Sequence, residues 1–243
     1  LADPAQPIEV GFLPIDGVGY SIALSGGFAY IGQSSGFQVV DISDPSAPSS
    51  ASLFPFPAVL GHVQIVGDLA YLSAFSQGLH IFDIGDPAAP VRVGQFNPLP
   101  FGLIEAAEIR GDYAFCADWL GLRVVDVRDP AAPTEVTLFD AVGAVLFTID
   151  VKGSMAYLSD GVGLRIVDLS NPLLPVSRGV LGRAHSGDIY YNLVAVGNLV
   201  YLADSIEGLR IIDVGDADHP VELSFLDARG YSYDVAHQDG LVY

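Results

Sequence analysis

Carboxylate side chains at recurring positions are the first residues in this sequence that could do chemistry. Asp118, Asp160 and Asp204 each follow a short strand-like run, and as a half-ring they could bind a cation, because hard cations prefer carboxylate oxygens. Three separate Asx turns, in which each carboxylate binds nearby backbone N–H groups, explain the same residues. The sequence contains no Asp-x-Asp-x-Asp-Gly calcium loop, so we prefer the turns and predict neither a metal nor another cofactor.

Histidine and serine residues give weaker signals of catalysis. The five histidines form no His-x-x-x-His pair and have no cysteine partner, so a zinc site has little support. His62 falls where its side chain could face a central channel, either as a hydrogen-bonded imidazole or as a ligand. Ser186 lies beside His185 and near Asp188, but the members of a catalytic triad converge from distant segments. No catalytic residue is therefore predicted.

Five further aspartates belong to a motif that repeats along the chain. The motif first appears at residues 36–48 as GFQVVDISDPSAP and returns at residues 78–90, 121–133, 163–175 and 208–220. A catalytic group is needed once, whereas a group that maintains the fold is needed in every repeat. We therefore expect these aspartates to bind turn backbone or to pair with neighbouring repeats. They are Asp41, Asp83, Asp126, Asp168 and Asp213, spaced by 42, 43, 42 and 45 residues.

Each repeat is expected to contain four short strands. Runs such as residues 28–30 precede each copy of the motif and follow a two-residue turn of Gly, Asn, Asp or Ser, most of which tolerate the positive φ of tight hairpins. In the first repeat the pattern predicts strands near residues 8–13, 20–24, 28–32 and 37–42. Four antiparallel strands at this period predict an all-β fold, a β-propeller of four-stranded blades. Two β-sandwich domains are the alternative, but sandwiches do not repeat one strand motif in register.

The repeats fill the whole chain as one domain, residues 1–243. The repeat units cover about 8–48, 49–90, 91–133, 134–175, 176–220 and, in part, 221–243, and residues 1–7 match the tail of a repeat. This arrangement predicts six blades with the last one incomplete, and a closing strand that lies outside the sequence. A longer array cut at the same phase would give the same pattern.

The copy at residues 163–175, Gly-Leu-Arg-Ile-Val-Asp-Leu-Ser-Asn-Pro-x-x-Pro, resembles the LVIVD repeat of bacterial and archaeal surface or secreted proteins. The resemblance extends over essentially the whole chain, although the fifth copy has Ala217 in place of a proline. It implies a propeller and an extracellular or cell-surface location, and it implies no catalytic residues. The aspartate usual near the start of the second strand is kept only as Asp234; the other repeats have Ser21, His62, Ala106, Thr148 and Asn192.

The most variable segments join the first strand of a repeat to the second and the third to the fourth. Both kinds of connection emerge on the same face of a propeller, so their side chains gather on one side of the molecule. An exposed aromatic patch there would mark a binding surface, whereas packing of several rings into the channel mouth would make them core. The candidate residues are Phe56, Phe101, Trp119, Phe147, Tyr191 and Tyr231.

Composition excludes several classes of protein. Twenty-nine acidic residues against ten basic ones give a formal net charge of −19, which repels phosphate backbones, so no nucleic-acid partner is expected. The chain is 51% hydrophobic, which excludes disorder, and no apolar run is long enough to predict a membrane span. Cys116 is the only cysteine, so no internal disulfide can form.

Together these features predict an acidic, non-enzymatic β-propeller that binds a protein or glycan partner or assembles with other chains. Two alternatives stay open. One is a hydrolase or lyase that acts at the channel mouth through His62, Glu105 or Asp234; it requires two titratable groups and a polar group within hydrogen-bond reach. The other is a structural subunit of a filament or cell envelope, which requires complementary patches on opposite surfaces.

Overall fold

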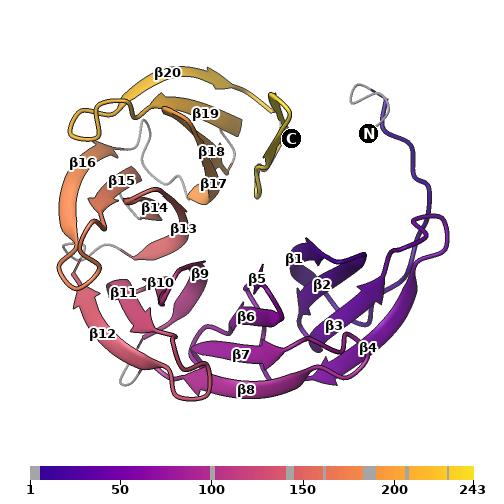
Figure 1. Ribbon diagram of the computed structural model, residues 1–243. Coiled ribbons are helices and arrows are strands. Elements are labelled where there is room, and N and C mark those ends of the chain that lie inside the picture. Colours follow the sequence, from indigo (N-terminus) through magenta and orange to yellow (C-terminus); the bar gives the residue numbers. More distant parts are fainter. Residues whose placement is uncertain are drawn as a thin grey trace.

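The computed structural model describes residues 6–98, 102–140, 145–160, 163–182, 190–205, 208–228 and 230–243, without the side chains of residues 190 and 191. These residues form five four-stranded antiparallel sheets and one two-stranded sheet, arranged as blades around an axis (Figure 1). The arrangement confirms the predicted all-β propeller. No helix in the described ranges has the length and hydrophobicity needed to cross a membrane.

The sheets follow one another along the chain and are numbered I to VI. Within each sheet the first strand in the chain lies nearest the axis and the last lies outermost (Figure 1). Sheet I contains β1 (Gly19–Ser25), β2 (Phe28–Gln33), β3 (Gly36–Asp41) and β4 (Ser49–Pro55); sheet II contains β5 (His62–Val66), β6 (Leu69–Ser73), β7 (Leu79–Asp83) and β8 (Val91–Phe96). Sheet III contains β9 (Ile104–Arg110), β10 (Tyr113–Asp118), β11 (Gly121–Asp126) and β12 (Thr134–Phe139); sheet IV contains β13 (Leu146–Lys152), β14 (Met155–Asp160), β15 (Gly163–Asp168) and β16 (Val176–Gly182). Sheet V contains β17 (Tyr190–Val196), β18 (Leu199–Asp204), β19 (Gly208–Asp213) and β20 (Val221–Leu226); sheet VI contains β21 (His237–Gln238) and β22 (Leu241–Val242).

The sheets are offset by one strand from the sequence repeats. The strand that follows each Asp-Pro turn pairs with the strand before that turn, as Ser49 does with Asp41, so it becomes the outermost strand of the same sheet. The first predicted strand, residues 8–13, pairs with no other strand in the described structure, and that prediction was wrong. The tight turn explains the offset, because its hydrogen bond from Ala47 N–H to Asp44 O, at 3.0 Å, reverses the chain.

The repeat aspartates hold these turns in place. Each carboxylate at the end of a third strand accepts a hydrogen bond from the backbone N–H two residues later, at 2.8 to 3.0 Å, which is the geometry of an Asx turn. Such a turn fixes the chain reversal without a second side chain. The five residues are Asp41, Asp83, Asp126, Asp168 and Asp213.

The hydrophobic core lies between neighbouring sheets. Phe37 on β3 packs against Phe82 on β7 with ring centroids 5.3 Å apart, and both side chains are fully buried. Similar clusters fill the spaces between sheets II and III, III and IV, and IV and V. The interior sheets are therefore covered on both faces, which explains the high hydrophobic content of the chain.

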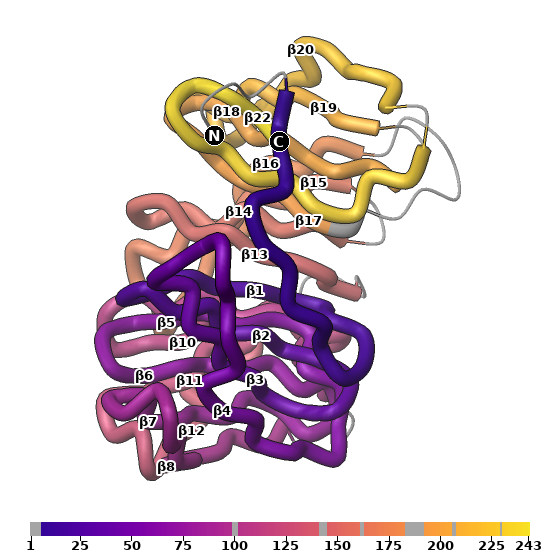
Figure 2. Tube along the Cα trace, turned by 90° about the vertical axis from the view of Figure 1, so that its right-hand side faces the viewer, coloured from indigo at the N-terminus to yellow at the C-terminus, as the bar shows by residue number. Residues whose placement is uncertain are grey.

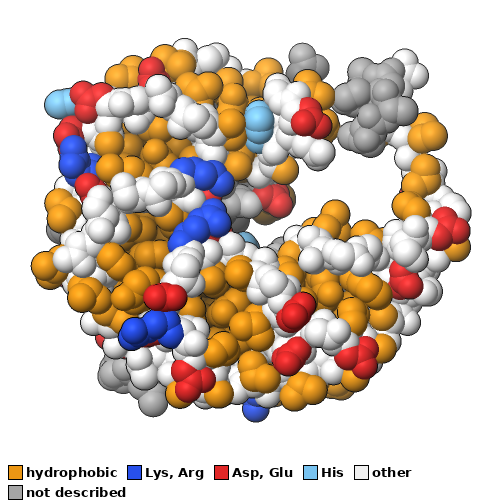
Figure 3. Space-filling model, in the orientation of Figure 1, with side chains coloured by type: hydrophobic (Ala, Val, Ile, Leu, Met, Phe, Trp, Pro, Cys, Tyr) orange, Lys and Arg blue, Asp and Glu red, His pale blue; other side chains and the backbone are white. Residues whose placement is uncertain are grey.

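The ring is open at one place. In Figures 1 and 2 the segment before β1 (indigo) extends from sheet I toward the C-terminal strands β21 and β22 (yellow), and no sheet lies between them. Hydrophobic side chains lie on both sides of this opening (Figure 3). We call the opening the slot.

Candidate binding face

The links from each outermost strand to the next innermost strand emerge on the same side as the turns between second and third strands. We call this side the candidate face. The innermost strands β1, β5, β9, β13 and β17 surround the axis of the propeller, and we use the word channel for the region around this axis (Figure 1). The variable segments thus gather around one mouth of the channel.

A chain of polar side chains at this mouth joins sheet IV, sheet V and the segment before β21. Thr148 Oγ1 donates a hydrogen bond to Asn192 Oδ1 at 2.9 Å, and Asn192 Nδ2 donates to Asp234 Oδ1. On the other side of the channel, Ser21 Oγ accepts a hydrogen bond from Val63 N–H of the next sheet at 3.1 Å. Equivalent positions therefore meet at Thr148, Asn192 and Asp234, and Ser21 contacts the residue after its equivalent, although these partners lie more than forty residues apart in sequence.

His62 occupies the same position in sheet II. Burial lowers the pKa of its imidazole below the usual range, while the nearby charge of Asp234 raises it in part. Its Nδ1 atom is buried without a hydrogen-bond partner among the described residues. This environment favours the neutral ring at neutral pH.

A second group of ionisable residues was not predicted from the sequence. It lies on the innermost strands β9 and β13, two residues after Ala106 and Thr148. Burial raises the pKa of Glu108 to about 7, and the nearby Asp150 carboxylate adds to this rise against the opposing effect of Arg110. Glu108 is 2.5 Å from Arg110, and Asp150 is 3.1 Å from Lys152. The signal that could have found the group is an alternation of charged residues on β9 and β13, an unusual pattern on strands next to a channel.

Asp118, Asp160 and Asp204 do not form a cation site. Each is fully buried and forms an ion pair with an arginine on the next strand: Asp118 with Arg123 at 2.9 Å, Asp160 with Arg165 at 3.0 Å, and Asp204 with Arg210. Two of them also bind turn backbone, because Asp118 accepts from Leu120 N–H and Asp160 from Gly163 N–H. Among the described residues there is no cluster of potential metal ligands.

A pattern in the repeats could have identified the arginines that pair with these buried aspartates, which were not predicted from the sequence. The first two repeats have Gln33 and Ala74 in place of the buried aspartate, and Gln38 and His80 in place of the arginine. Aspartate and arginine thus occur together or not at all, as expected if each charge needs the other when both are buried.

The structure separates the predicted aromatic residues. Phe56 is only 6% exposed and packs against the ring of His80, so it belongs to the core and not to an exposed patch. Trp119 is 44% exposed, and its Nε1–H donates a hydrogen bond to Glu105 at 2.7 Å. Phe147 is partly buried, whereas Tyr231 is exposed and stacks on Tyr233 with centroids 5.8 Å apart. Phe101 and the side chain of Tyr191 lie outside the described residues.

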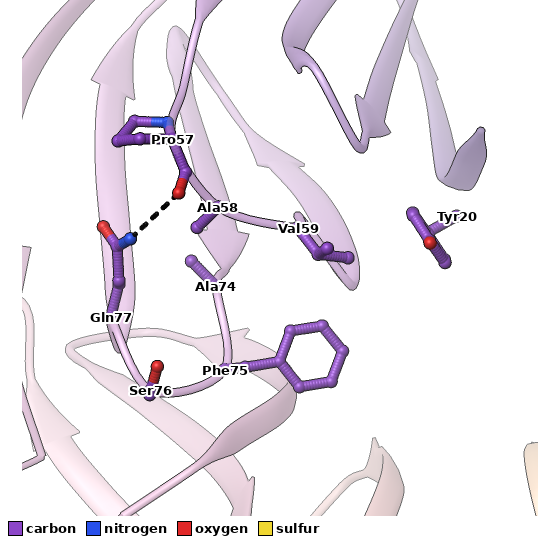
Figure 4. Close-up of a pocket in the computed structure, with 8 residues that line it drawn as sticks. All are labelled: Tyr20, Pro57, Ala58, Val59, Ala74, Phe75, Ser76 and Gln77. Carbon is purple, nitrogen blue, oxygen red and sulfur yellow. Dashed lines mark hydrogen bonds between the residues drawn. The ribbon is translucent and has the colours of Figure 1, made fainter. Parts of the chain in front are cut away.

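A shallow pocket lies on the candidate face, between sheets I and II. It has a volume of about 530 Å³, and Figure 4 shows Tyr20, Val59 and Phe75 around it. Gln77 Nε2 donates a long hydrogen bond of 3.5 Å to Pro57 O, which links the two loops that form its wall. The walls combine apolar side chains with the polar groups of Ser76 and Gln77, so the pocket offers both kinds of contact near the channel mouth.

Comparison with known families identifies the class of the protein. The LVIVD repeat model matches residues 16–53, 61–98, 106–141, 148–179 and 191–227, which is most of the chain. The chain therefore belongs to the LVIVD repeat family. Among curated proteins no sequence match was found.

Solved structures with a similar fold include a protein from Lactobacillus plantarum, with a TM-score of 0.82, 14% identity and coverage of 93% of this chain and 76% of that one. A β-propeller domain from Myceliophteria thermophila has a TM-score of 0.69, 13% identity and coverage of 87% and 74%. The periplasmic gluconolactonase of Pseudomonas aeruginosa has a TM-score of 0.74, 9% identity and coverage of 87% and 71%. The chain spans 66% to 76% of the length of the first matched structures, and at these identities the likeness shows the propeller fold alone.

Proposed function

We propose that this propeller is a non-enzymatic extracellular or cell-surface binding module that binds a protein or glycan partner through the candidate face. The observation that carries the proposal is the environment of Trp119. Its indole N–H is already satisfied by Glu105 at 2.7 Å, yet the side chain is 44% exposed. The exposed ring surface is therefore free to stack on a partner without a further polar requirement.

Other groups on the candidate face support the same function. The stacked pair Tyr231 and Tyr233 is exposed, and the polar chain Thr148–Asn192–Asp234 lies at the channel mouth. Rigid aromatic rings beside hydrogen-bonding groups are typical of binding surfaces. The net charge of −19 would repel an anionic partner, so we expect a neutral glycan or a protein with a neutral or basic surface.

The gluconolactonase similarity raises the enzymatic alternative, but the polar residues at the mouth favour it less. In the described part of the chain, the Asp234 carboxylate accepts hydrogen bonds from Asn192 Nδ2 and from its neighbour Val235 N–H. Neither donor is titratable. General acid–base catalysis needs a second proton-transferring group within hydrogen-bond reach, and His62 makes no hydrogen bond with Asp234 there.

Binding of the wild-type chain to an array of neutral glycans and to immobilised basic and neutral proteins tests the proposal. Against any partner that the array identifies, Trp119→Ala and Tyr231→Ala should each weaken binding about tenfold or more, as expected for aromatic hot spots. Leu174→Ala is the matched control, because Leu174 is 69% exposed in a turn on the opposite face. Equal losses in all three variants, or no loss in the aromatic ones, would exclude the candidate face.

A further inference from the structure

The pocket between sheets I and II has no charged side chain on its walls. None of the eight described residues around it is Asp, Glu, Lys, Arg or His, although the whole chain has a net charge of −19. A charged ligand would leave water and find no opposite charge there. The volume of about 530 Å³ is in the range of sites for small ligands. The walls therefore favour a small neutral ligand, or one neutral unit of a longer one.

Two aromatic rings give the pocket flat apolar surfaces. Tyr20 comes from β1 and Phe75 from the turn between β6 and β7, and Figure 4 shows the Phe75 ring directed toward the side on which Tyr20 lies. Tyr20 is 51% exposed and Phe75 is partly buried. The face of an aromatic ring is electrically negative and attracts C–H groups, which are weakly positive. A ligand with C–H groups on a flat face would stack on these rings.

The position of Phe75 is fixed before any ligand binds. Its φ is 49°, a conformation that is unfavourable for a bulky side chain. Its N–H donates to Ile104 O and its carbonyl oxygen accepts from Ile104 N–H, both at 3.1 Å, so sheet III holds the residue. The turn of sheet V at residues 204–208 has the same length as that at residues 74–78, and there Ser205 has a φ of 30°. The turn thus imposes the strain, and in sheet II it presents an aromatic ring where a small polar residue also fits.

Polar groups follow Phe75 in the same turn. Ser76 is exposed and Gln77 is partly buried. The bond from Gln77 Nε2 to Pro57 O is 3.5 Å long and uses one amide hydrogen, whereas an amide has a second hydrogen and an acceptor oxygen. An apolar peptide side chain would remove water from these groups and return no hydrogen bond. The ligand therefore needs hydroxyl or amide groups beside its apolar face.

The aromatic surface continues from the pocket toward Trp119. Phe75 is bonded to Ile104 of β9, and the indole N–H of Trp119 is bonded to the next residue, Glu105, at 2.7 Å. Consecutive residues of one strand thus hold both aromatic residues. A ligand with several similar units can place one unit in the pocket and the next against the exposed indole.

We propose that the pocket binds one neutral pyranose unit of a glycan, and that the adjacent unit lies over Trp119. A pyranose ring has C–H groups on its faces and hydroxyl groups around its edge, so it meets both requirements of the walls. Its faces stack on Tyr20 and Phe75, and its hydroxyl groups bond to Ser76 and Gln77. This inference rests on the proposed function and selects a glycan from the partners named there.

The test measures binding of the complete chain to neutral hexasaccharides of glucose, mannose and N-acetylglucosamine, by saturation-transfer NMR and then by calorimetric titration. At least one of them should bind saturably. Phe75→Leu keeps an apolar side chain but removes the flat ring, and it should weaken this binding about tenfold. Tyr20→Leu should act in the same way. Gln77→Ala should cost about threefold or more, as expected for one hydrogen bond.

Phe225→Leu is the matched control, because Phe225 is 52% exposed on β20, the outermost strand of sheet V. It should leave the affinity unchanged. Thermal melting of each variant checks that it folds, and Tyr20→Leu decides the question if Phe75→Leu unfolds, since half of the Tyr20 side chain is already in water.

Unchanged affinity in Phe75→Leu and Tyr20→Leu would overturn the pocket proposal. If Trp119→Ala still weakened binding, the candidate face would stand without the pocket. Binding to proteins but to none of the hexasaccharides would overturn the pocket proposal as well, and would leave the proposed function intact. A loss in Phe225→Leu as large as that in Phe75→Leu would also count against the pocket.

Discussion

Ile149 and Ile22 hold the same position on the innermost strands β13 and β1, but their environments differ. Ile149 is 6% exposed because sheet III covers it, whereas Ile22 is 62% exposed because it faces the slot. The residues are identical and the strands have the same pairing inside their own sheets. Burial in this fold is therefore a property of two neighbouring sheets, and pairing within one sheet does not supply it.

The largest effect is expected inside the closed part of the ring. Asp160→Ala leaves the buried guanidinium of Arg165 without its carboxylate, so the free energy of unfolding should fall by about 3–5 kcal/mol. Urea denaturation measures it. The double variant Asp160→Gln/Arg165→Gln places at these positions the neutral side chains that sheet I has as Gln33 and Gln38, and should recover part of the loss. A double variant as unstable as the single one would contradict the account of the ion pair.

The same comparison can be made with an apolar side chain. Ile149→Ala should lower the free energy of unfolding by about 2–5 kcal/mol, because it opens a cavity between two sheets. Ile22→Ala is the matched variant on the open side and should cost about 0.5 kcal/mol or less. Similar losses in urea denaturation would mean that Ile22 is covered in solution.

A pH dependence should arise from Glu108, whose position in sheet I is held by the uncharged Ala23. Burial raises the pKa of Glu108 from 4.5 to about 7 in the folded chain. Its contribution to stability is therefore fully present below about pH 4.5 and is lost as the pH rises through 7, by up to about 3 kcal/mol. Glu108→Gln should remove this part of the slope in urea titrations between pH 4.5 and 8. An unchanged slope would show that Glu108 titrates normally.

The smallest effect concerns two outer carboxylates. Glu222→Gln removes a partly exposed ion pair with the buried Arg210 and should cost about 1 kcal/mol. Glu9→Gln should cost nothing measurable in the free chain, since Glu9 has no partner among the described residues. The difference between the two melting temperatures measures this contrast, and a loss at Glu9 as large as that at Glu222 would show that Glu9 has an ion-pair partner in solution.

The repeat motif was sufficient to predict the propeller, because the turn residues and the strand period are local properties of the chain. The sequence did not predict that the strand after the Asp-Pro turn pairs with the strand before it. The turn determines which sheet receives the next strand, and the motif alone does not show the direction in which the turn sends the chain. The hydrogen bond of Thr148 with Asn192, and the electrostatic effect of Asp150 on Glu108, could not be predicted from one repeat. They depend on how closely equivalent positions of neighbouring sheets approach one another at the axis.

Phe56 shows the same limit on the candidate face. Its segment is variable and rich in proline, which favoured an exposed loop, but the ring fills the space beside His80 in the next sheet. Trp119 lies in a comparable connection and stays exposed, because Glu105 fixes its indole at the surface. The three-dimensional contacts of each ring, which the local sequence does not show, distinguish the two aromatic residues.

Amide hydrogen exchange along the whole chain tests most directly whether burial in this fold depends on two neighbouring sheets. The amides of β13, which sheet III covers, should be protected, while the equivalent amides of β1, which faces the slot, should exchange about tenfold or more faster. Equal protection of β1 and β13 would contradict the account.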